Sequence, residues 1–156
     1  MLADSRVSEL FSILDKANLS PIWVEDMKKT LWVKLLLNIA INPLAAISGV
    51  ENGMILEQPG LMNQAMAVME EARTVALIEG IEIDQLEIVE TLTEVLQRTA
   101  GNRCSMLQDV IAARKTEIDS FCGEVASRAE HHGIPTPLNN QLIALIKAIE
   151  DSYAIR

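Results

Sequence analysis

Aromatic residues and cysteines are scarce in this 156-residue sequence, which has 3% aromatic content and two cysteines, Cys104 and Cys122. So few aromatic residues disfavour a β-sandwich or β-barrel, whose strands alternate β-branched and aromatic side chains. Two cysteines far apart in the chain exclude a disulfide scaffold and a Cys-x-x-Cys motif. We therefore expect reduced thiols in a cytoplasmic protein.

Positive charge is also scarce, because 13 Lys and Arg residues face 22 Asp and Glu residues, for a formal net charge of −9 at pH 7. Nucleic acids and anionic membranes attract basic surfaces, so this charge argues against both as partners. Neither G-x-G-x-x-G nor G-x-x-x-x-G-K-[ST] occurs in the sequence, so no phosphate-binding loop is predicted. The first residues do not show a signal-peptide pattern.

One apolar run, residues 31–47, is long enough to raise the question of a membrane span. It contains Lys34, Asn38, Asn42 and Pro43. A lysine in mid-span costs about 2.5–3.5 kcal/mol on membrane-insertion scales. Hydrophobic residues make up 49% of the sequence, which is enough for a sizeable core. We therefore interpret the run as a helix buried in protein.

Apolar residues recur at helical spacing along most of the chain, which predicts an all-α bundle of six to seven helices. Pro43 is expected to kink or end the second helix near Asn42, with a further turn closed by Gly49. Asn52-Gly53 indicates a turn. Side-chain caps are predicted at Asp84, Thr116 and Thr136. The predicted helices cover residues 4–17, 25–41, 59–80, 84–101, 103–113, 116–133 and 136–149.

A single short segment, Ile22-Trp23-Val24 after Pro21, favours an extended conformation. Nothing else in the chain resembles a strand, and a lone strand cannot satisfy its own backbone N–H and C=O groups. The segment therefore needs a partner that the rest of the chain does not offer.

The apolar second helix carries a polar stripe. Lys34, Asn38 and Asn42 are spaced by four, so each is offset from the last by about 40° around a helix. In an apolar environment a lysine and two amides cost several kcal/mol unless they have partners. A polar seam bonded to neighbouring backbone would explain them, and so would a cleft wall. In a cleft, a lysine whose pKa is lowered by partial desolvation would act as a general acid, and the amides would hold carbonyl or hydroxyl oxygens.

A second polar group contains Asn102, Ser105 and Glu117. On sequence physics alone, a glycine stop explains Asn102, and helix N-termini explain Ser105 and Glu117. His131-His132 does not indicate a metal site, because adjacent helical residues face different directions and no third ligand is evident.

Several separate motifs, taken in order, resemble one protein family. Residues 32–44, Trp-Val-Lys-Leu-Leu-Leu-Asn-Ile-Ala-Ile-Asn-Pro-Leu, followed by Asn52-Gly53, resemble the start of the C-terminal domain of ketopantoate reductase (2-dehydropantoate 2-reductase). Residues 102–109, Asn-Arg-Cys-Ser-Met-Leu-Gln-Asp, with Glu117 beyond them, resemble a second family motif. Residues 133–139, Gly-Ile-Pro-Thr-Pro-Leu-Asn, resemble the closing motif. The resemblance covers nearly the whole chain from Trp23 onward.

This resemblance implies a fold and an activity. Full-length members of the family reduce ketopantoate to pantoate with NADPH, in the pathway to pantothenate and coenzyme A. Their active site lies between an N-terminal Rossmann domain and an all-helical, phosphogluconate-dehydrogenase-like C-terminal domain. Matched by motif, Lys34 is the catalytic proton donor and Glu117 an active-site glutamate. The family's substrate-binding positions correspond to Asn38, Asn42, Asn52, Asn102 and Ser105, the last two beside the substrate carboxylate.

The resemblance also implies a division of the chain. Residues 1–24 resemble the last helix and last strand of the Rossmann domain, and residues 25–156 the helical domain. We expect such a chain alone to bind substrate weakly, to carry no NADPH and to be inactive without a Rossmann domain in cis or in trans. Two alternatives stay open: a stand-alone helical interaction or homo-oligomerisation module that kept the fold but not the activity, and a reductase of another 2-oxo acid.

Overall fold

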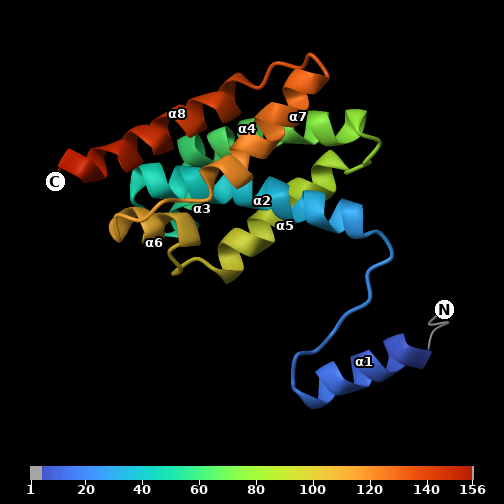
Figure 1. The fold of residues 1–156 in the computed structure, drawn as a ribbon. Coiled ribbons are helices and arrows are strands. Elements are labelled where there is room, and N and C mark those ends of the chain that lie inside the picture. The colour runs from blue at the N-terminus through green and yellow to red at the C-terminus, as the bar shows by residue number, and fades with distance from the viewer. Residues whose placement is uncertain (1–4, 156) are drawn as a thin grey trace.

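The computed structural model describes residues 5–155, and within them the fold is all-α, as predicted (Figure 1). These residues form eight α-helices and two 3-10 helices and contain no β-strand. The predicted first helix began at Asp4, which lies outside the described residues. The elements are α1 (Ser5–Lys16), α2 (Met27–Ser48), α3 (Asn52–Glu57), α4 (Pro59–Ile78), α5 (Gln85–Arg98), α6 (Ser105–Ile111), η1 (Ile118–Ser120), α7 (Cys122–His131), α8 (Pro137–Asp151) and η2 (Ser152–Ile155).

Helix α2 is the central helix of the bundle, as its nearly all-round apolar sequence predicts. It packs against α3, α4, α6 and α8, and Figure 1 shows it running through the middle of the molecule. Its most buried large side chains, Leu36 and Ile39, are 0% exposed. Of its most apolar stretch, 56% is buried inside the fold. The hydropathy of α2 is therefore explained by the core of the bundle and gives no support to a membrane span.

Pro43 lies inside α2, which continues to Ser48 instead of ending near Asn42. The expectation of a further turn closed by Gly49 is confirmed, because Gly49 adopts φ +69° and its N–H donates to the Ala45 carbonyl at 2.9 Å. Asn42 and Pro43 are both buried. The packing of this half of α2 outweighs the roughly 3 kcal/mol that an internal proline costs a helix.

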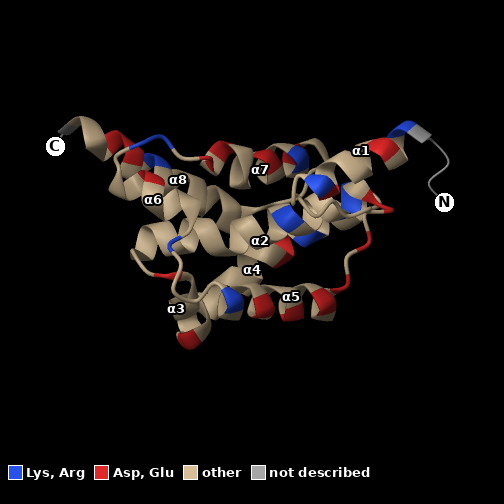
Figure 2. Cartoon of the chain, turned by 90° about the horizontal axis from the view of Figure 1, so that it is seen from below, with Lys and Arg blue, Asp and Glu red and all other residues tan. Residues whose placement is uncertain are grey.

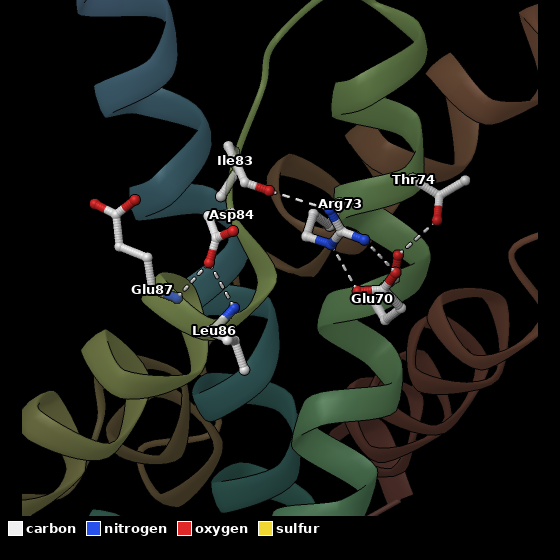
Figure 3. Close-up of polar contacts among 7 residues, drawn as sticks. All are labelled: Glu70, Arg73, Thr74, Ile83, Asp84, Leu86 and Glu87. Carbon is white, nitrogen blue, oxygen red and sulfur yellow. Dashed lines mark hydrogen bonds and ion pairs between the residues drawn. The ribbon is translucent and has the colours of Figure 1, made fainter.

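The start of α5 is capped as predicted. An Asp84 carboxylate oxygen accepts two backbone N–H groups of the first turn, each at 2.9 Å (Figure 3). The preceding loop is fastened to α4, because the Arg73 guanidinium donates to the Ile83 carbonyl at 3.0 Å and pairs with Glu70 at 2.7 Å. This anchoring sets the direction in which α5 leaves α4.

The caps predicted at Thr116 and Thr136 are wrong. Thr116 accepts only from the Ile118 N–H, at 3.3 Å, and the short 3-10 helix η1 precedes α7, which begins at Cys122. Thr136 occupies the N-cap position of α8, but its side chain makes no capping bond. The carboxylate of Glu71, on α4, binds the first turn of α8 instead. A carboxylate is a stronger acceptor than a hydroxyl for these N–H groups.

Asn52-Gly53, predicted to be a turn, forms the first two residues of α3. The Asn52 N–H donates to the Asn102 carbonyl at 3.0 Å, and the Gly53 N–H donates to the Ala100 carbonyl at 2.9 Å. The turn after α5 thus satisfies N–H groups that a helix start leaves open. Gly53 is so close to this turn that a Cβ there would lie 2.9 Å from the Ala100 Cβ. Local patterning missed α3 because a six-residue helix is too short to show a period.

Helix α1 stands apart from the bundle and is joined to α2 by an extended segment (Figure 1). The predicted extended piece lies in this segment and forms no strand within residues 5–155. Ile22 is 81% exposed and Trp23 is 61% exposed. The centres of the Trp23 ring and the Phe11 ring on α1 are 6.2 Å apart. Apolar exposure of this extent is typical of a surface that another protein surface covers.

Candidate active site

The polar stripe on α2 becomes more deeply buried along the helix. The Lys34 side chain is exposed, Asn38 is half-buried and Asn42 is 7% exposed. Because these residues lie about one turn apart on one face, the stripe runs from the molecular surface into the bundle. Figure 2 shows basic residues on α2 in a molecule whose α5 displays mainly acidic ones.

The Lys34 ammonium has no ion pair among the described residues. Arginines of the bundle are paired: Arg73 with Glu70 at 2.7 Å and Arg128 with Glu79 at 2.8 Å. An unpaired ammonium beside two amides can donate to a carbonyl oxygen of a ligand. The Lys34 side chain is exposed, so the described residues do not enclose it as the walls of a cleft would.

Asn52 and Asn102 are brought together by the turn after α5. Besides the backbone bond between them, the Asn52 Nδ2 donates to Thr99 Oγ1 at 3.0 Å, and this hydroxyl donates to the Val95 carbonyl at 2.7 Å. Asn52 is 7% exposed, whereas Asn102 is exposed. Sequence reasoning missed Thr99 as the partner of Asn52, because no motif links the two positions.

The start of α6 brings Ser105 next to α2. Cys104, rather than Ser105, caps α6: its Sγ accepts from the Leu107 N–H at 3.4 Å and donates to the Asn42 carbonyl at 3.6 Å. Ser105 is the first residue of α6, and its side chain is exposed. Burial raises the pKa of the Cys104 thiol, so the group stays protonated and able to donate at neutral pH. The structural explanation of Ser105 as a cap is therefore wrong.

Glu117 immediately precedes η1, and its carboxylate is exposed. Its backbone carbonyl accepts the N–H groups of Ser120 and Phe121 at 3.0 and 3.1 Å, which fixes its position. Contacts thus connect Asn42, Asn52, Asn102 and Ser105 through neighbouring residues of α2, α3 and α6. Within residues 5–155, no hydrogen bond or ion pair joins Lys34 or Glu117 to these four.

Each of the two histidines has a partner within the fold. The Nδ1 of His131 lies 2.7 Å from the Ser127 carbonyl, and the Nε2 of His132 lies 3.8 Å from Glu79. Both side chains are exposed. Their surroundings are those of a helix end, where histidine is locally favourable.

A hollow of about 340 Å³ lies beside the N-terminal half of α2. Its lining includes Lys28, Trp32, Glu79 and Arg128, from α2, α7 and the loop after α4. The Arg128 guanidinium lies 5.8 Å from the centre of the Trp32 ring. None of the predicted substrate-binding residues lines this hollow, and no motif indicated it, because its walls meet only on folding.

Known proteins with this fold show the class to which the chain belongs. Residues 26–150 match the family described as "Ketopantoate reductase PanE/ApbA C terminal". A PanE/ApbA family ketopantoate reductase from Ralstonia eutropha JMP134 aligns with a TM-score of 0.87 and 30% identity, over 96% of this chain and 50% of that one. D-mandelate dehydrogenase with NADH and anilino(oxo)acetate aligns with a TM-score of 0.88 and 25% identity, over 97% of this chain and 64% of that one. The chain thus belongs to a class of all-helical domains that occur in these oxidoreductases.

Curated relatives narrow this class to one enzyme family. The 2-dehydropantoate 2-reductase of Vibrio cholerae is 38% identical over 137 residues, which cover 87% of this chain and 46% of the relative. That of Archaeoglobus fulgidus is 34% identical over 151 residues, which cover 94% of this chain and 50% of the relative. The chain belongs to the ketopantoate reductase family, as a C-terminal domain. It spans about half the length of these relatives.

Proposed function

We propose that this chain is the substrate-binding and catalytic domain of a reductase that converts ketopantoate to pantoate with NADPH, on the way to pantothenate and coenzyme A. One observation carries the proposal. Lys34, Asn38 and Asn42 form a stripe that enters the core of a fold whose relatives are 2-dehydropantoate 2-reductases. An unpaired ammonium followed by two amides is a suitable wall for a small oxygen-rich substrate.

Reduction of a ketone builds negative charge on its oxygen, which needs a proton donor and fixed dipoles. We assign proton donation to the Lys34 ammonium. Asn38 and Asn42 orient the substrate oxygens. The exposed Ser105 hydroxyl and Asn102 amide hold the carboxylate. We also assign Asn52 to the substrate-binding site and Glu117 to contact with the substrate or the cofactor.

NADPH supplies the hydride when it is bound. The sequence contains no glycine-rich loop for the cofactor's phosphates, so the described residues do not form a complete dinucleotide site. What they offer at the reacting end is the Lys34 ammonium and the Glu117 carboxylate, both exposed. We therefore assign the phosphates to an N-terminal Rossmann domain and expect this chain alone to hold no cofactor.

We propose that residues 1–24 belong to that Rossmann domain and residues 25–156 to the helical domain. The exposed apolar side chains support this division: Leu10 and Ile13 on α1 are 52% and 57% exposed, and Met27 and Leu31 at the start of α2 are each 57% exposed. Lys34 lies one turn after Leu31. A domain that covers Leu31 would therefore also desolvate the lysine.

The test is ketopantoate-dependent oxidation of NADPH, followed by absorbance. We expect no turnover by the 156-residue chain and turnover when it is joined to the N-terminal half of the Vibrio cholerae relative. Lys34→Ala in the joined protein should abolish the activity, with a loss of at least about 100-fold in kcat. Lys28→Ala on the same helix is the matched control and should retain it. Equal activity of the two variants would refute the assignment of Lys34.

A second candidate is a reductase of the same kind acting on another 2-oxo acid. It is favoured by the likeness to D-mandelate dehydrogenase, whose structure holds anilino(oxo)acetate. Comparing kcat/KM for ketopantoate and for benzoylformate, the 2-oxo acid that corresponds to mandelate, decides between the two. A higher value for benzoylformate would replace the first candidate by the second and leave the role of Lys34 in place.

A further inference from the structure

The geometry points to Cys104 as a positioning residue that fixes the substrate-binding Ser105 of α6 against Asn42 of α2. This inference rests on the proposed function, because it assigns Cys104 a role in that same substrate site. Cys104 itself is not placed in contact with the substrate.

The Cys104 thiol makes two hydrogen bonds that join different helices. It accepts from the Leu107 N–H at 3.4 Å, which caps α6, and it donates to the Asn42 carbonyl at 3.6 Å, which ties that cap to α2. Sulfur forms longer and weaker hydrogen bonds than oxygen, as these distances reflect. The single side chain therefore closes a bridge between the N-terminus of α6 and the buried end of the polar stripe.

The bridge formed by the Cys104 thiol lies next to two of the proposed substrate-binding residues. Ser105 follows Cys104 directly, and Asn42 supplies the carbonyl that the thiol binds. Asn42 is 7% exposed and Cys104 is 8% exposed, so both are held by packing, while the Ser105 side chain projects into solvent. A shift of the α6 start relative to α2 would change the position of Ser105 relative to Asn42, and a substrate that binds both residues would lose one contact.

The second cysteine supplies a matched comparison. Cys122, the first residue of α7, is also buried, at 0% exposure, and within residues 5–155 its thiol bonds to none of the proposed substrate residues. Substitution by valine or alanine removes the same group, a buried thiol, at either position. Only at Cys104 does the change remove a bridge between α2 and α6.

The first readout is the infrared S–H stretching band, which shifts with hydrogen bonding and does not require activity. In the 156-residue chain, Cys122→Ala leaves only the Cys104 thiol, and Cys104→Ala leaves only that of Cys122. We expect saturating pantoate to shift the Cys104 band and to leave the Cys122 band unchanged, with sodium chloride at matched ionic strength as the blank. Side-chain amide signals of Asn38 and Asn42, followed by NMR, report pantoate binding independently.

The second readout is the kinetics of the chain joined to the N-terminal half of the Vibrio cholerae relative. Cys104→Val should raise KM for ketopantoate about 3- to 10-fold with kcat changed less than about twofold, because substrate contacts are lost without loss of the proton donor. Cys104→Ser, which restores a donor and a cap, should recover the wild-type KM. Cys122→Val should leave KM unchanged.

Two results would overturn the inference in distinguishable ways. If pantoate moves the Asn38 and Asn42 signals while the Cys104 band stays fixed, or Cys104→Val lowers stability with KM unchanged, Cys104 is only a structural cap and the proposed function stands. If no signal responds to pantoate and the joined protein does not oxidise NADPH with ketopantoate, both the inference and the proposed function fail.

Discussion

The carboxylate of Glu71 on α4 accepts two hydrogen bonds from Asn139 on α8. The Glu71 carboxylate accepts the Asn139 backbone N–H at 3.0 Å, its side-chain Nδ2 at 2.9 Å and the Leu138 N–H at 2.9 Å. Asn139 is 0% exposed, and its Nδ2 also donates to the Val68 carbonyl at 3.2 Å. The first turn of α8 is thus capped by a residue 67 positions earlier in the chain.

Glu71→Ala should therefore destabilise the fold by about 2 kcal/mol, because it leaves buried donors at the start of α8 unpaired. Urea unfolding followed by circular dichroism measures this difference in the free energy of unfolding. Glu90→Ala, an exposed glutamate of α5, is the control and should change stability by less than about 0.5 kcal/mol. Similar urea midpoints for the two variants would show that the hydrogen bonds of Glu71 make no net contribution to the free energy of unfolding.

Gly53→Ala should destabilise the fold by about 1–3 kcal/mol, because its new Cβ would lie 2.9 Å from the Ala100 Cβ and must displace the turn after α5. Gly60→Ala is the matched control in α4, where a Cβ meets nothing within 4 Å. That change should stabilise the chain by about 0.5–1 kcal/mol through helix propensity. Thermal unfolding of the two variants should move in opposite directions; a shared direction would contradict the close approach at Gly53.

The buried thiol of Cys122 predicts a loss of stability in alkali. Burial raises its pKa from 9.0 to about 12. Above pH 9 the unfolded chain releases this proton while the folded chain keeps it. The contribution of the protonated thiol to the free energy of unfolding is therefore fully present below pH 9 and is lost as the pH rises toward 12. The contribution is about 1 kcal/mol per pH unit in that window. Urea midpoints of wild type and Cys122→Ala, measured from pH 8 to 10.5, should converge, whereas parallel curves would exclude this origin.

Lys34→Ala should separate stability from activity. The side chain is exposed and has no ion pair within the described part of the chain, so its removal should change the free energy of unfolding by less than about 0.5 kcal/mol. Turnover of the joined protein should nevertheless be lost. A large fall in stability would show that Lys34 supports the fold, and would remove the main argument for its catalytic assignment.

The all-α class and the polar stripe could be predicted because both follow from the spacing of residues within individual helices. Lys34, Asn38 and Asn42 share a face whatever the remaining chain does. The depth of each residue could not be predicted, since burial depends on which helices pack around α2. The same limit explains Pro43. The local rule predicts a kink or an end of the helix near Asn42, but the helix continues to Ser48 because tertiary packing of Asn42 and Pro43 outweighs the cost of an internal proline.

The partners of the site residues were also beyond sequence reasoning. Thr99 binds Asn52 across 47 positions, and Cys104 binds Asn42 across 62. Such pairs are fixed only when distant segments meet, and no local period or cap signals them. At Thr136 the local sequence predicts the N-cap position correctly but not the capping group. The Glu71 carboxylate of α4, and not the Thr136 hydroxyl, accepts the N–H groups at the start of α8.

The increasing depth of the α2 stripe has a consequence for motion. The Lys34 side chain, at the surface on a four-carbon stem, can change rotamer within picoseconds to nanoseconds. The Asn42 side chain is buried, and close packing restricts rotamer changes of buried side chains. In the proposed reaction, the exposed end of the stripe can therefore follow a substrate oxygen whose position changes, while the buried end moves less. One helix thus carries a more mobile donor at the surface and a less mobile one in the core.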